Sequence, residues 1–158
     1  MNLRLKHVED TDIPFLERSL NKEHVLKWYH DADEWLNEIK ERNGEFRFLT
    51  HFVVMDGDKA IGFCQYYDTY DAQEEWYTVE KPGDIFSIDY FIGEEEYLGK
   101  GYGKAIVQAL IEVMKKHHQF NTIVVQPERE NAASNGVLLA NGFTYDEEKE
   151  YYILHMHE

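Results

Sequence analysis

The sequence has few of the residues that build covalent or metal crosslinks. Its 158 residues include one cysteine, Cys64, and three prolines. One cysteine excludes an internal disulfide and any site that needs several thiolates, such as a structural zinc or iron–sulfur centre. The eight histidines have no clear cysteine or carboxylate partner, so we expect no metal. A single cysteine also fits a reducing compartment, and we expect a cytoplasmic protein.

Long apolar runs and basic residues are also scarce. No apolar run approaches the roughly 18 residues of a membrane span, and no basic-then-apolar segment indicates a signal peptide, so we expect no membrane association. Lys and Arg number 16 against 31 Asp and Glu, which gives a formal net charge of −15. Such a chain repels nucleic acid and anionic membranes and attracts cations. A cationic substrate is favoured, with an ordinary solubilising acidic surface as the alternative.

The remaining composition is that of a folded globular chain. Hydrophobic residues make up 43% and aromatic residues 15% of the sequence, which argues against intrinsic disorder. No internal repeat and no Gly/Ser-rich linker interrupts it. We therefore expect residues 1–158 to form a single domain.

The hydrophobic pattern predicts a mixed α/β sheet with helices packed on it. Short runs rich in β-branched and aromatic residues predict strands over 3–7, 46–55, 59–67, 85–92, 122–125, 143–146 and 151–156. Helical spacing of apolar residues predicts helices over 13–20, 23–29, 33–42, 103–118 and 131–141. The polar, acidic and aromatic stretch 68–84 is predicted to be a long loop or short helix, and loops of that length are often functional.

Three glycines at alternate positions join the strand 85–92 to the helix 103–118, in the run Leu98-Gly99-Lys100-Gly101-Tyr102-Gly103-Lys104. A backbone without Cβ atoms turns tightly and approaches a ligand closely, and the N–H groups of a helix N-terminus favour an anion. Lys100 and Lys104 add positive charge, so a diphosphate fits best. Walker and dinucleotide patterns do not match, because Gly101 follows Lys100 and because Lys104 and Ile106 stand where glycine is needed. The alternative is an ordinary flexible turn.

The glycine segment resembles motif A of the GNAT N-acetyltransferases, whose pattern is Gln/Arg-x-x-Gly-x-Gly/Ala. Gly101 and Gly103 match its glycines, and Leu98 replaces the usual Gln or Arg. Three longer segments resemble the aminoglycoside 6'-N-acetyltransferases of that family: the stretch 88–103, the strand Ile61-Gly62-Phe63-Cys64-Gln65-Tyr66-Tyr67, and the series Pro127, Asn131, Asn141-Gly142-Phe143.

This resemblance implies a fold and a co-substrate. The family fold is a central mixed, mostly antiparallel sheet with a splayed strand pair, flanked by helices, and acetyl-CoA lies in the splay. Its pantetheine arm is expected on the backbone of residues 90–92 and its pyrophosphate on the amides of residues 98–104. The cofactor-binding residues so implied are Tyr90, Phe91, Ile92, Leu98, Gly99, Lys100, Gly101, Tyr102, Gly103, Lys104 and Asn131.

Asp89 is the catalytic residue that the resemblance implies. It stands in an apolar strand, where a carboxylate is costly unless it is paired or used. An acceptor ammonium must lose a proton before it attacks a thioester, and in the similar enzymes this position holds the carboxylate that accepts it. A structural ion pair is the alternative. Leu138 stands where the family often has a tyrosine acid, so the thiolate leaves unassisted or with help from a group such as Tyr102 or Tyr145.

Carboxylates interleaved with aromatic residues follow the strand 59–67. Such a mixture suits a polycationic acceptor that carries rings, although a solvated acidic loop is the alternative. Trp28 and Trp35 either line the site or pack the small helices, and we expect packing. The substrate-binding candidates are Tyr66, Asp68, Tyr70, Asp71, Glu74 and Asp84.

The sequence thus predicts an acetyl-CoA-dependent N-acetyltransferase that acts by direct attack, with an aminoglycoside 6'-amino group as the first candidate acceptor. Two alternatives stay open. The acceptor is another amine, namely a polyamine, a peptide N-terminus or a lysine-like metabolite, or the chain is a CoA-binding sensor without turnover. A monomer or homodimer is expected.

Overall fold

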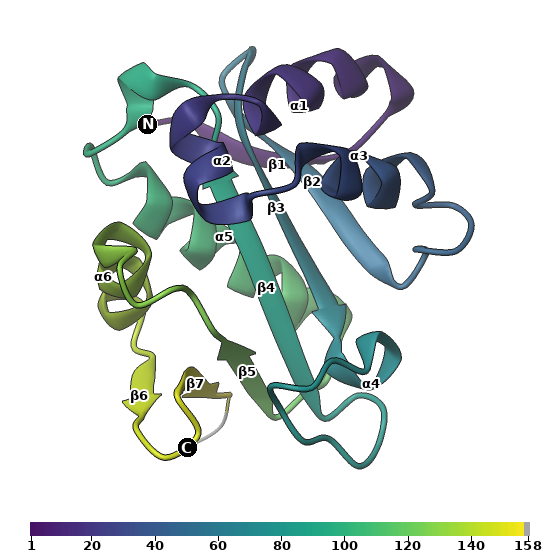
Figure 1. Cartoon of the computed structure of the whole chain (residues 1–158), viewed down its shortest axis with the longest axis vertical. Helices are drawn as coiled ribbons and strands as arrows, with labels where there is room; N and C mark the ends of the chain where they lie inside the picture. Colours follow the sequence, from purple (N-terminus) through teal and green to yellow (C-terminus); the bar gives the residue numbers. More distant parts are fainter. Residues whose placement is uncertain (157–158) are drawn as a thin grey trace.

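The computed structural model describes residues 1–156, so that His157 and Glu158 of the expected domain lie outside the described residues. Each predicted strand and helix is present (Figure 1), and one short helix, α4, begins the expected loop. The elements are β1 (Leu3–His7), α1 (Ile13–Leu20), α2 (Glu23–Tyr29), α3 (Ala32–Lys40), β2 (Leu49–Asp56), β3 (Lys59–Asp68), α4 (Thr69–Ala72), β4 (Ile85–Ile92), α5 (Tyr102–His117), β5 (Thr122–Val125), α6 (Ala132–Ala140), β6 (Thr144–Asp146) and β7 (Tyr151–His155).

The ends of two early elements differ from the prediction. Helix α3 stops at Lys40, and strand β2 starts at Leu49 rather than at residue 46. The backbone between them forms turns, in which the N–H of Phe46 donates to Glu41 and the N–H of Leu49 donates to Phe46. The aromatic residues Phe46 and Phe48 therefore extend the strand-like pattern without pairing in the sheet.

The sheet confirms the expected mixed, mostly antiparallel architecture. Its seven strands lie in the order β1-β2-β3-β4-β5-β7-β6. Strands β4 and β5 are parallel, and the other neighbours are antiparallel. The parallel pair needs a crossover connection, and α5 supplies it.

Strands β4 and β5 separate after a short ladder. They pair from Ile85 to Ser87 with Thr122 to Val124, while β4 continues to Ile92 beside β3 alone. Figure 1 shows β5 leaving the line of β4 in the middle of the sheet. The residues 88–92 consequently have one edge that no strand of the described chain covers, which is the splay that the sequence comparison implied.

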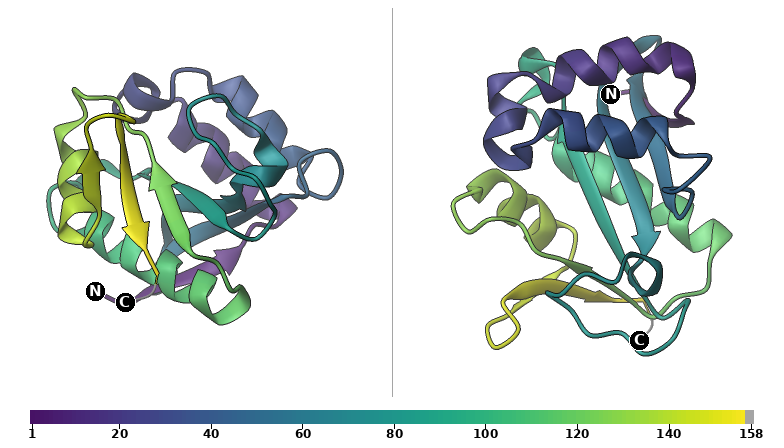
Figure 2. Two further views of the ribbon diagram at one scale, coloured as in Figure 1. Left: turned by 90° about the horizontal axis from the view of Figure 1, so that it is seen from below. Right: turned by 45° about the vertical axis from the view of Figure 1, so that its right-hand side comes forward.

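Helices cover the two faces of the sheet (Figure 2), with α1, α2 and α3 on one face and α5 on the other. Because side chains alternate along a strand, Phe63 of β3 packs with the helices α1 and α3, whereas Cys64 and Tyr66 pack with α5. Cys64 is fully buried, and burial raises the pKa of its thiol, so this cysteine is an inert core residue.

Helix α5 anchors the glycine segment to this core. It buries Ile106, Val107, Leu110, Ile111 and Met114 on one face. Each such side chain stabilises the fold by about 1.5–3 kcal/mol, so the N-terminus of α5 is firmly placed beside β4. Among the described helices, including this 16-residue one, none is both long and apolar enough for a membrane crossing.

Candidate active site

Two cavities meet at the splay. One, about 550 Å³, lies between the glycine segment, the second half of β4 and the start of α6, and we call it the glycine-loop cleft. The other, about 510 Å³, opens between α2, α3, β3, β4 and the segment after α4, and we call it the acidic cavity. Both walls include Trp28, Tyr29, Tyr90, Asn131 and Ser134. Ligands bound in the two cavities therefore meet at these residues.

Glycines shape one part of the glycine-loop cleft, and apolar side chains such as Val25, Phe91 and Val137 line much of the rest. Gly99 and Gly101 have φ angles of 72° and 87°, a region that side chains with a Cβ rarely adopt, and Gly101 is the N-cap of α5. A Cβ on Gly103 would lie 3.1 Å from Val137 Cγ2, so this glycine lets α5 and α6 approach closely. The N-terminal amides of α5 thus reach the cleft without side chains in front of them.

Most of the expected cofactor residues lie in the wall of this cleft. Lys100 and Tyr102 are not among the residues that line it. The Tyr102 hydroxyl points away from the cleft and donates to Asp56 Oδ2 at 3.1 Å. Asn131 accepts a hydrogen bond from the Ser134 N–H at 3.1 Å and so caps α6 at the junction of the cavities. The expected residues that do line the cleft are Tyr90, Phe91, Ile92, Leu98, Gly99, Gly101, Gly103, Lys104 and Asn131.

Side chains of α2 occupy the free edge of β4. The Tyr29 hydroxyl donates to the Tyr90 carbonyl and accepts from the Tyr90 N–H, the latter at 3.3 Å. His24 Nε2 lies 2.8 Å from the Ile92 carbonyl oxygen. The backbone groups of Tyr90 and Ile92 therefore face the splay, and a ligand that pairs with them takes the place of these side chains.

The acidic cavity differs from the glycine-loop cleft in the charge of its walls. Its lining includes the carboxyl groups Glu34, Glu38, Glu74, Asp89 and Glu128, and no Lys or Arg of the described chain. Aromatic side chains fill much of the remaining wall, namely Trp28, Tyr29, Trp35, Phe46, Phe48, Tyr67, Trp76 and Tyr90. Carboxylates set among aromatic faces favour cations. Residues 1–156 contain no group of three metal-ligating side chains placed to hold a metal ion.

Asp89 lies in the wall of this cavity on β4. Gln65 stands opposite it on β3, and its Nε2 donates to Asp89 Oδ2 at 2.8 Å. Burial raises the pKa of Asp89 to about 7; the Gln65 hydrogen bond lowers it, and the charges of Glu74 and Glu38 raise it further. A carboxyl group with a pKa near 7 can accept and release a proton at neutral pH.

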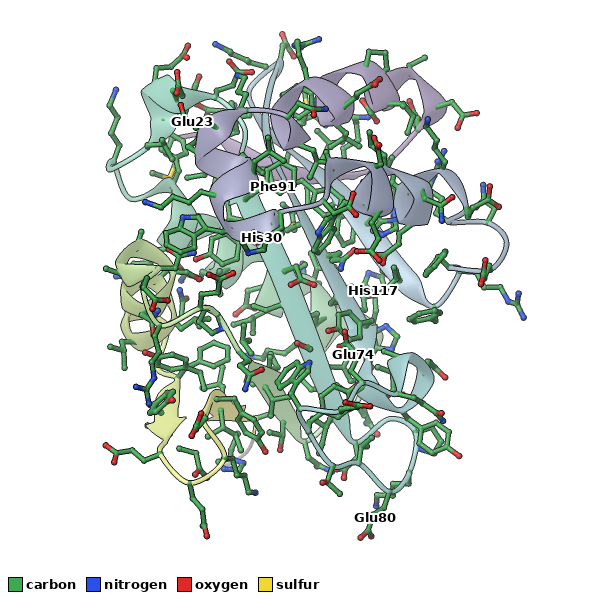
Figure 3. The ribbon with its side chains drawn as sticks, viewed as in Figure 1. Glu23, His30, Glu74, Glu80, Phe91 and His117 are labelled. Carbon is green, nitrogen blue, oxygen red and sulfur yellow. The ribbon has the colours of Figure 1, made fainter. Side chains whose placement is uncertain are left out.

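Two further carboxyl groups reach the cavity from different elements. Glu74 Oε1 accepts from the Tyr67 hydroxyl at 3.0 Å and from Trp76 Nε1 at 3.2 Å. Figure 3 labels Glu74 near the end of β3. Glu38 comes from α3, and burial, followed by the charges of Glu34 and Glu74, raises its pKa to about 7.

Of the six acceptor candidates from the sequence, Glu74 alone lines the acidic cavity. The prediction that Tyr66 binds the acceptor is corrected, because its side chain points to the α5 face of the sheet and its hydroxyl lies 3.0 Å from His118 Nε2. Asp68 and Asp84 stabilise turns: Asp68 accepts from the N–H groups of Tyr70 and Gly83, and Asp84 accepts from Asn121 Nδ2. The exposed residues Tyr70 and Asp71 also lie outside the lining.

Several cavity residues were missed or misplaced by sequence reasoning. Trp28 and Trp35 line the cavity rather than only packing the small helices. Tyr29, Glu34 and Glu38 were not singled out. The spacing of Glu34 and Glu38, four residues apart, places both on one face of α3 and was an available signal. The alternation Gln65–Tyr67, in register with Asp89 and Ser87, was another.

The comparison with protein families decides the class of this site. A model of the GNAT acetyltransferase domain matches residues 2–144. The chain belongs to the GNAT family. It is therefore an acyltransferase whose co-substrate is acetyl-CoA.

Individual relatives resemble this chain in sequence or in fold. Aminoglycoside N(6')-acetyltransferases type 1 of Klebsiella pneumoniae and Serratia marcescens are each 24% identical over 136 residues, 82% of this chain and 68% of theirs. The aminoglycoside acetyltransferase AAC(6')-Ib, solved with coenzyme A and kanamycin, has a TM-score of 0.83 at 22% identity, over 98% of this chain and 95% of that one. RimL, a ribosomal L7/L12 α-N-protein acetyltransferase solved with coenzyme A, has a TM-score of 0.72 at 14% identity, over 98% and 94%.

The residues of the glycine-loop cleft fit acetyl-CoA. The cleft includes Lys104 and the N-terminus of α5 but no Asp or Glu among the described residues, which suits phosphates. The Tyr90 and Ile92 backbone groups at the free edge of β4 suit the amides of an extended arm.

Proposed function

We propose that this GNAT enzyme acetylates an amino group of a polycationic small molecule, with the 6'-amino group of an aminoglycoside as the first candidate. The observation that carries the proposal is the meeting of two cavities of opposite character at Tyr90. The cleft that suits an anionic co-substrate opens beside a cavity that carries five carboxyl groups. The relatives named for aminoglycoside acetylation support the choice of acceptor.

In this proposal, Asp89 is the general base. Its carboxylate holds the acceptor ammonium and takes one proton, which leaves the amine free to attack. When bound, acetyl-CoA supplies the thioester that the amine attacks directly. The pKa of about 7 supports this role, because a base of that pKa is largely ionised at slightly alkaline pH and still basic enough to accept a proton.

The other residues orient the two substrates. Glu74 and Glu38 bind further ammonium groups of the acceptor, and the aromatic walls contact its rings. Leu138 is fully buried in the core, and neither Tyr102 nor Tyr145 lines either cavity. We therefore propose that none of these three positions supplies an acid to the thiolate.

Thiol release from acetyl-CoA against a panel of amines tests the proposal. The panel contains several aminoglycosides, spermidine and short peptides, each with the wild-type enzyme and with Asp89→Asn. The proposal predicts turnover on aminoglycosides that collapses in the variant. Turnover on peptides or spermidine alone would show that the acceptor is one of those amines and not an aminoglycoside. Coenzyme A binding without turnover on any amine would contradict the proposal.

A further inference from the structure

Three polar residues lie side by side across the centre of the sheet. His51 on β2 pairs in register with Gln65 on β3, and Gln65 pairs with Asp89 on β4. Residues in register on neighbouring strands point to the same face, here the face that α1, α2 and α3 cover. His51 is 4% exposed and Gln65 is 2% exposed, so these two are buried polar side chains within an apolar layer.

One of the two neighbouring pairs in this row forms a hydrogen bond, and the other, His51 with Gln65, does not. Gln65 Nε2 donates to Asp89 Oδ2 at 2.8 Å. Gln65 Oε1 and both ring nitrogens of His51 are buried without a partner at that geometry. His51 and Gln65 are register partners on neighbouring strands, so the imidazole and the amide lie side by side on one face of the sheet. A buried ring N–H and a buried amide oxygen are both costly unless they pair.

The chemistry of the three groups allows one arrangement. An ionised carboxylate only accepts hydrogen bonds, so the Gln65 amide must present its nitrogen to Asp89 and its oxygen toward β2. The neutral imidazole of His51 has one N–H, which matches that oxygen. Burial lowers the pKa of His51 to about 4, so the ring is neutral at pH 7 and adds no positive charge beside the carboxylate.

We infer that His51 is a positioning residue for acetyl transfer, because its ring N–H donates to Gln65 Oε1 and thereby fixes the amide that donates to the Asp89 carboxylate. The inference rests on the proposed role of Asp89 as the base. His51 is too deeply buried to touch the acceptor itself. It acts through Gln65, which holds one carboxylate oxygen while the other remains for the ammonium.

Other titratable groups also act on Asp89, and the test must separate them from His51. Arg42 acts on His51, whose pKa its charge lowers. The groups that surround Asp89 come from each element packed against it: Tyr29 of α2, Glu34 and Glu38 of α3, Tyr67 of β3, Glu74 of the segment after α4, and Tyr90 of β4. None of them is changed in the variants below.

The first test is His51→Phe, which keeps a ring and removes the N–H. The free amide then loses its fixed orientation, and Asp89 loses a hydrogen bond that lowers its pKa. The pKa of Asp89 is expected to rise by about 0.5 to 1. The acid limb of the kcat/KM profile moves upward equally, kcat at pH 7 falls about two- to fivefold, and the KM for acetyl-CoA stays within about twofold.

Matched variants separate positioning from general damage. His51→Gln keeps an N–H donor and is expected to restore the wild-type midpoint. His118→Phe is the control, because His118 contacts the Tyr66 hydroxyl on the opposite face of the sheet. It removes a histidine–hydroxyl contact at an exposed position and is expected to leave the Asp89 midpoint unchanged.

A titration of the carboxyl carbon of Asp89 by carbon-13 NMR reads the same midpoint without any substrate. The Asp89 signal is identified as the one that is missing in Asp89→Asn. A shift in His51→Phe on an enzyme that acetylates no tested amine would sustain the inference while the proposed function fails. An unshifted midpoint in a folded His51→Phe protein overturns the inference whatever the activity.

The wild-type protein provides a readout if His51→Phe does not fold. Long-range nitrogen–proton NMR is expected to show His51 as a neutral imidazole with one slowly exchanging N–H between pH 6 and 8, in contact with the Gln65 side chain. A charged ring in that range, or a ring N–H that exchanges rapidly with water, overturns the inference.

Discussion

The two cavities that meet at Tyr90 are built in opposite ways. The glycine-loop cleft presents backbone amides and one lysine, Lys104, and takes much of its wall from residues 90–104 and 131–140. The acidic cavity presents side chains, and its carboxyl groups come from α3, β4, the segment after α4 and the segment before α6. The residues of the glycine-loop cleft thus come from three segments, 24–29, 90–104 and 131–140, whereas the carboxyl groups of the acidic cavity come from four separate elements or segments.

This difference determines how each cavity should respond to substitution. A site made of backbone is sensitive to residues that change main-chain conformation and insensitive to most side-chain changes. A site made of carboxylates is sensitive to the loss of single charges and to pH. Variants confined to one cavity should therefore alter one substrate and not the other.

The largest effect is expected for Asp89→Asn. Loss of the general base should lower kcat about 100-fold or more, because general-base catalysis contributes about 10²–10⁴. The KM for acetyl-CoA should change less than twofold, since Asp89 does not line the glycine-loop cleft. Steady-state kinetics with both substrates varied measures this, and a matching loss of acetyl-CoA affinity would break the separation of the two cavities.

The pH dependence of the wild type follows from the same carboxyl group. The base form of Asp89 is the ionised one, so kcat/KM should rise as pH increases through about 7. Folded Asp89 binds a proton more tightly than the unfolded group, so its ionisation destabilises the fold as pH rises from about 4 to 7. Asp89→Asn should therefore melt at a higher temperature than wild type at pH 8, and a lower melting temperature would contradict the raised pKa.

Gly101→Ala should weaken acetyl-CoA binding about fivefold. The residue has a φ angle of 87°, so a Cβ strains the N-cap of α5 and moves its amides. Gly83→Ala is the control, because Gly83 also has a positive φ, 78°, with open space around it, and lies between α4 and β4 outside the glycine-loop cleft. Both variants should lose similar stability, and an equal rise of the acetyl-CoA KM in both would show that the cleft has no special role.

Glu38→Gln tests the acidic cavity without touching the base. The acceptor KM should rise about three- to tenfold as one ammonium-binding charge is lost. The acid limb of kcat/KM should move to lower pH, because the charge of Glu38 raises the pKa of Asp89. Glu80→Gln is the matched control, since the exposed Glu80 lies outside both cavities (Figure 3). Equal effects of the two variants would point to general charge attraction instead of a defined site.

The smallest effect is expected for Tyr29→Phe. The Tyr29 hydroxyl occupies the N–H and carbonyl of Tyr90, which the proposed acetyl-CoA arm would use. Removing it should tighten coenzyme A binding about twofold to threefold, which isothermal titration calorimetry detects. Weaker binding in this variant would show that the hydroxyl remains with the strand when the ligand is bound.

The same contrast explains what sequence reasoning found. The strands, the helix register of α5 and the glycine segment follow from local pattern, because turn glycines and apolar periodicity act within a few residues. Motif resemblance extended this to the splay and to most residues of the cleft. The direction of the Tyr102 side chain could not be predicted, because its contact with Asp56 joins positions far apart in sequence.

The acidic cavity was harder to predict because composition does not show which way each side chain points. Tyr66 and Tyr67 are neighbours of the same type, yet strand alternation sends one to α5 and the other to the cavity. Asp68 and Asp84 look like binding residues in the sequence but cap turns in the fold. Glu38 reaches the cavity from a helix about 50 residues before Asp89. Its spacing from Glu34 shows that the two share a helix face but not that this face meets Asp89.

The most direct test of the account is to measure coenzyme A and kanamycin binding by calorimetry in two single variants, one for each cavity. Lys104→Gln should weaken coenzyme A about threefold to tenfold and leave kanamycin unchanged, whereas Glu74→Gln should weaken kanamycin by a similar factor and leave coenzyme A unchanged. Variants that each shift both affinities together would contradict the division into an anion-binding cleft and a cation-binding cavity.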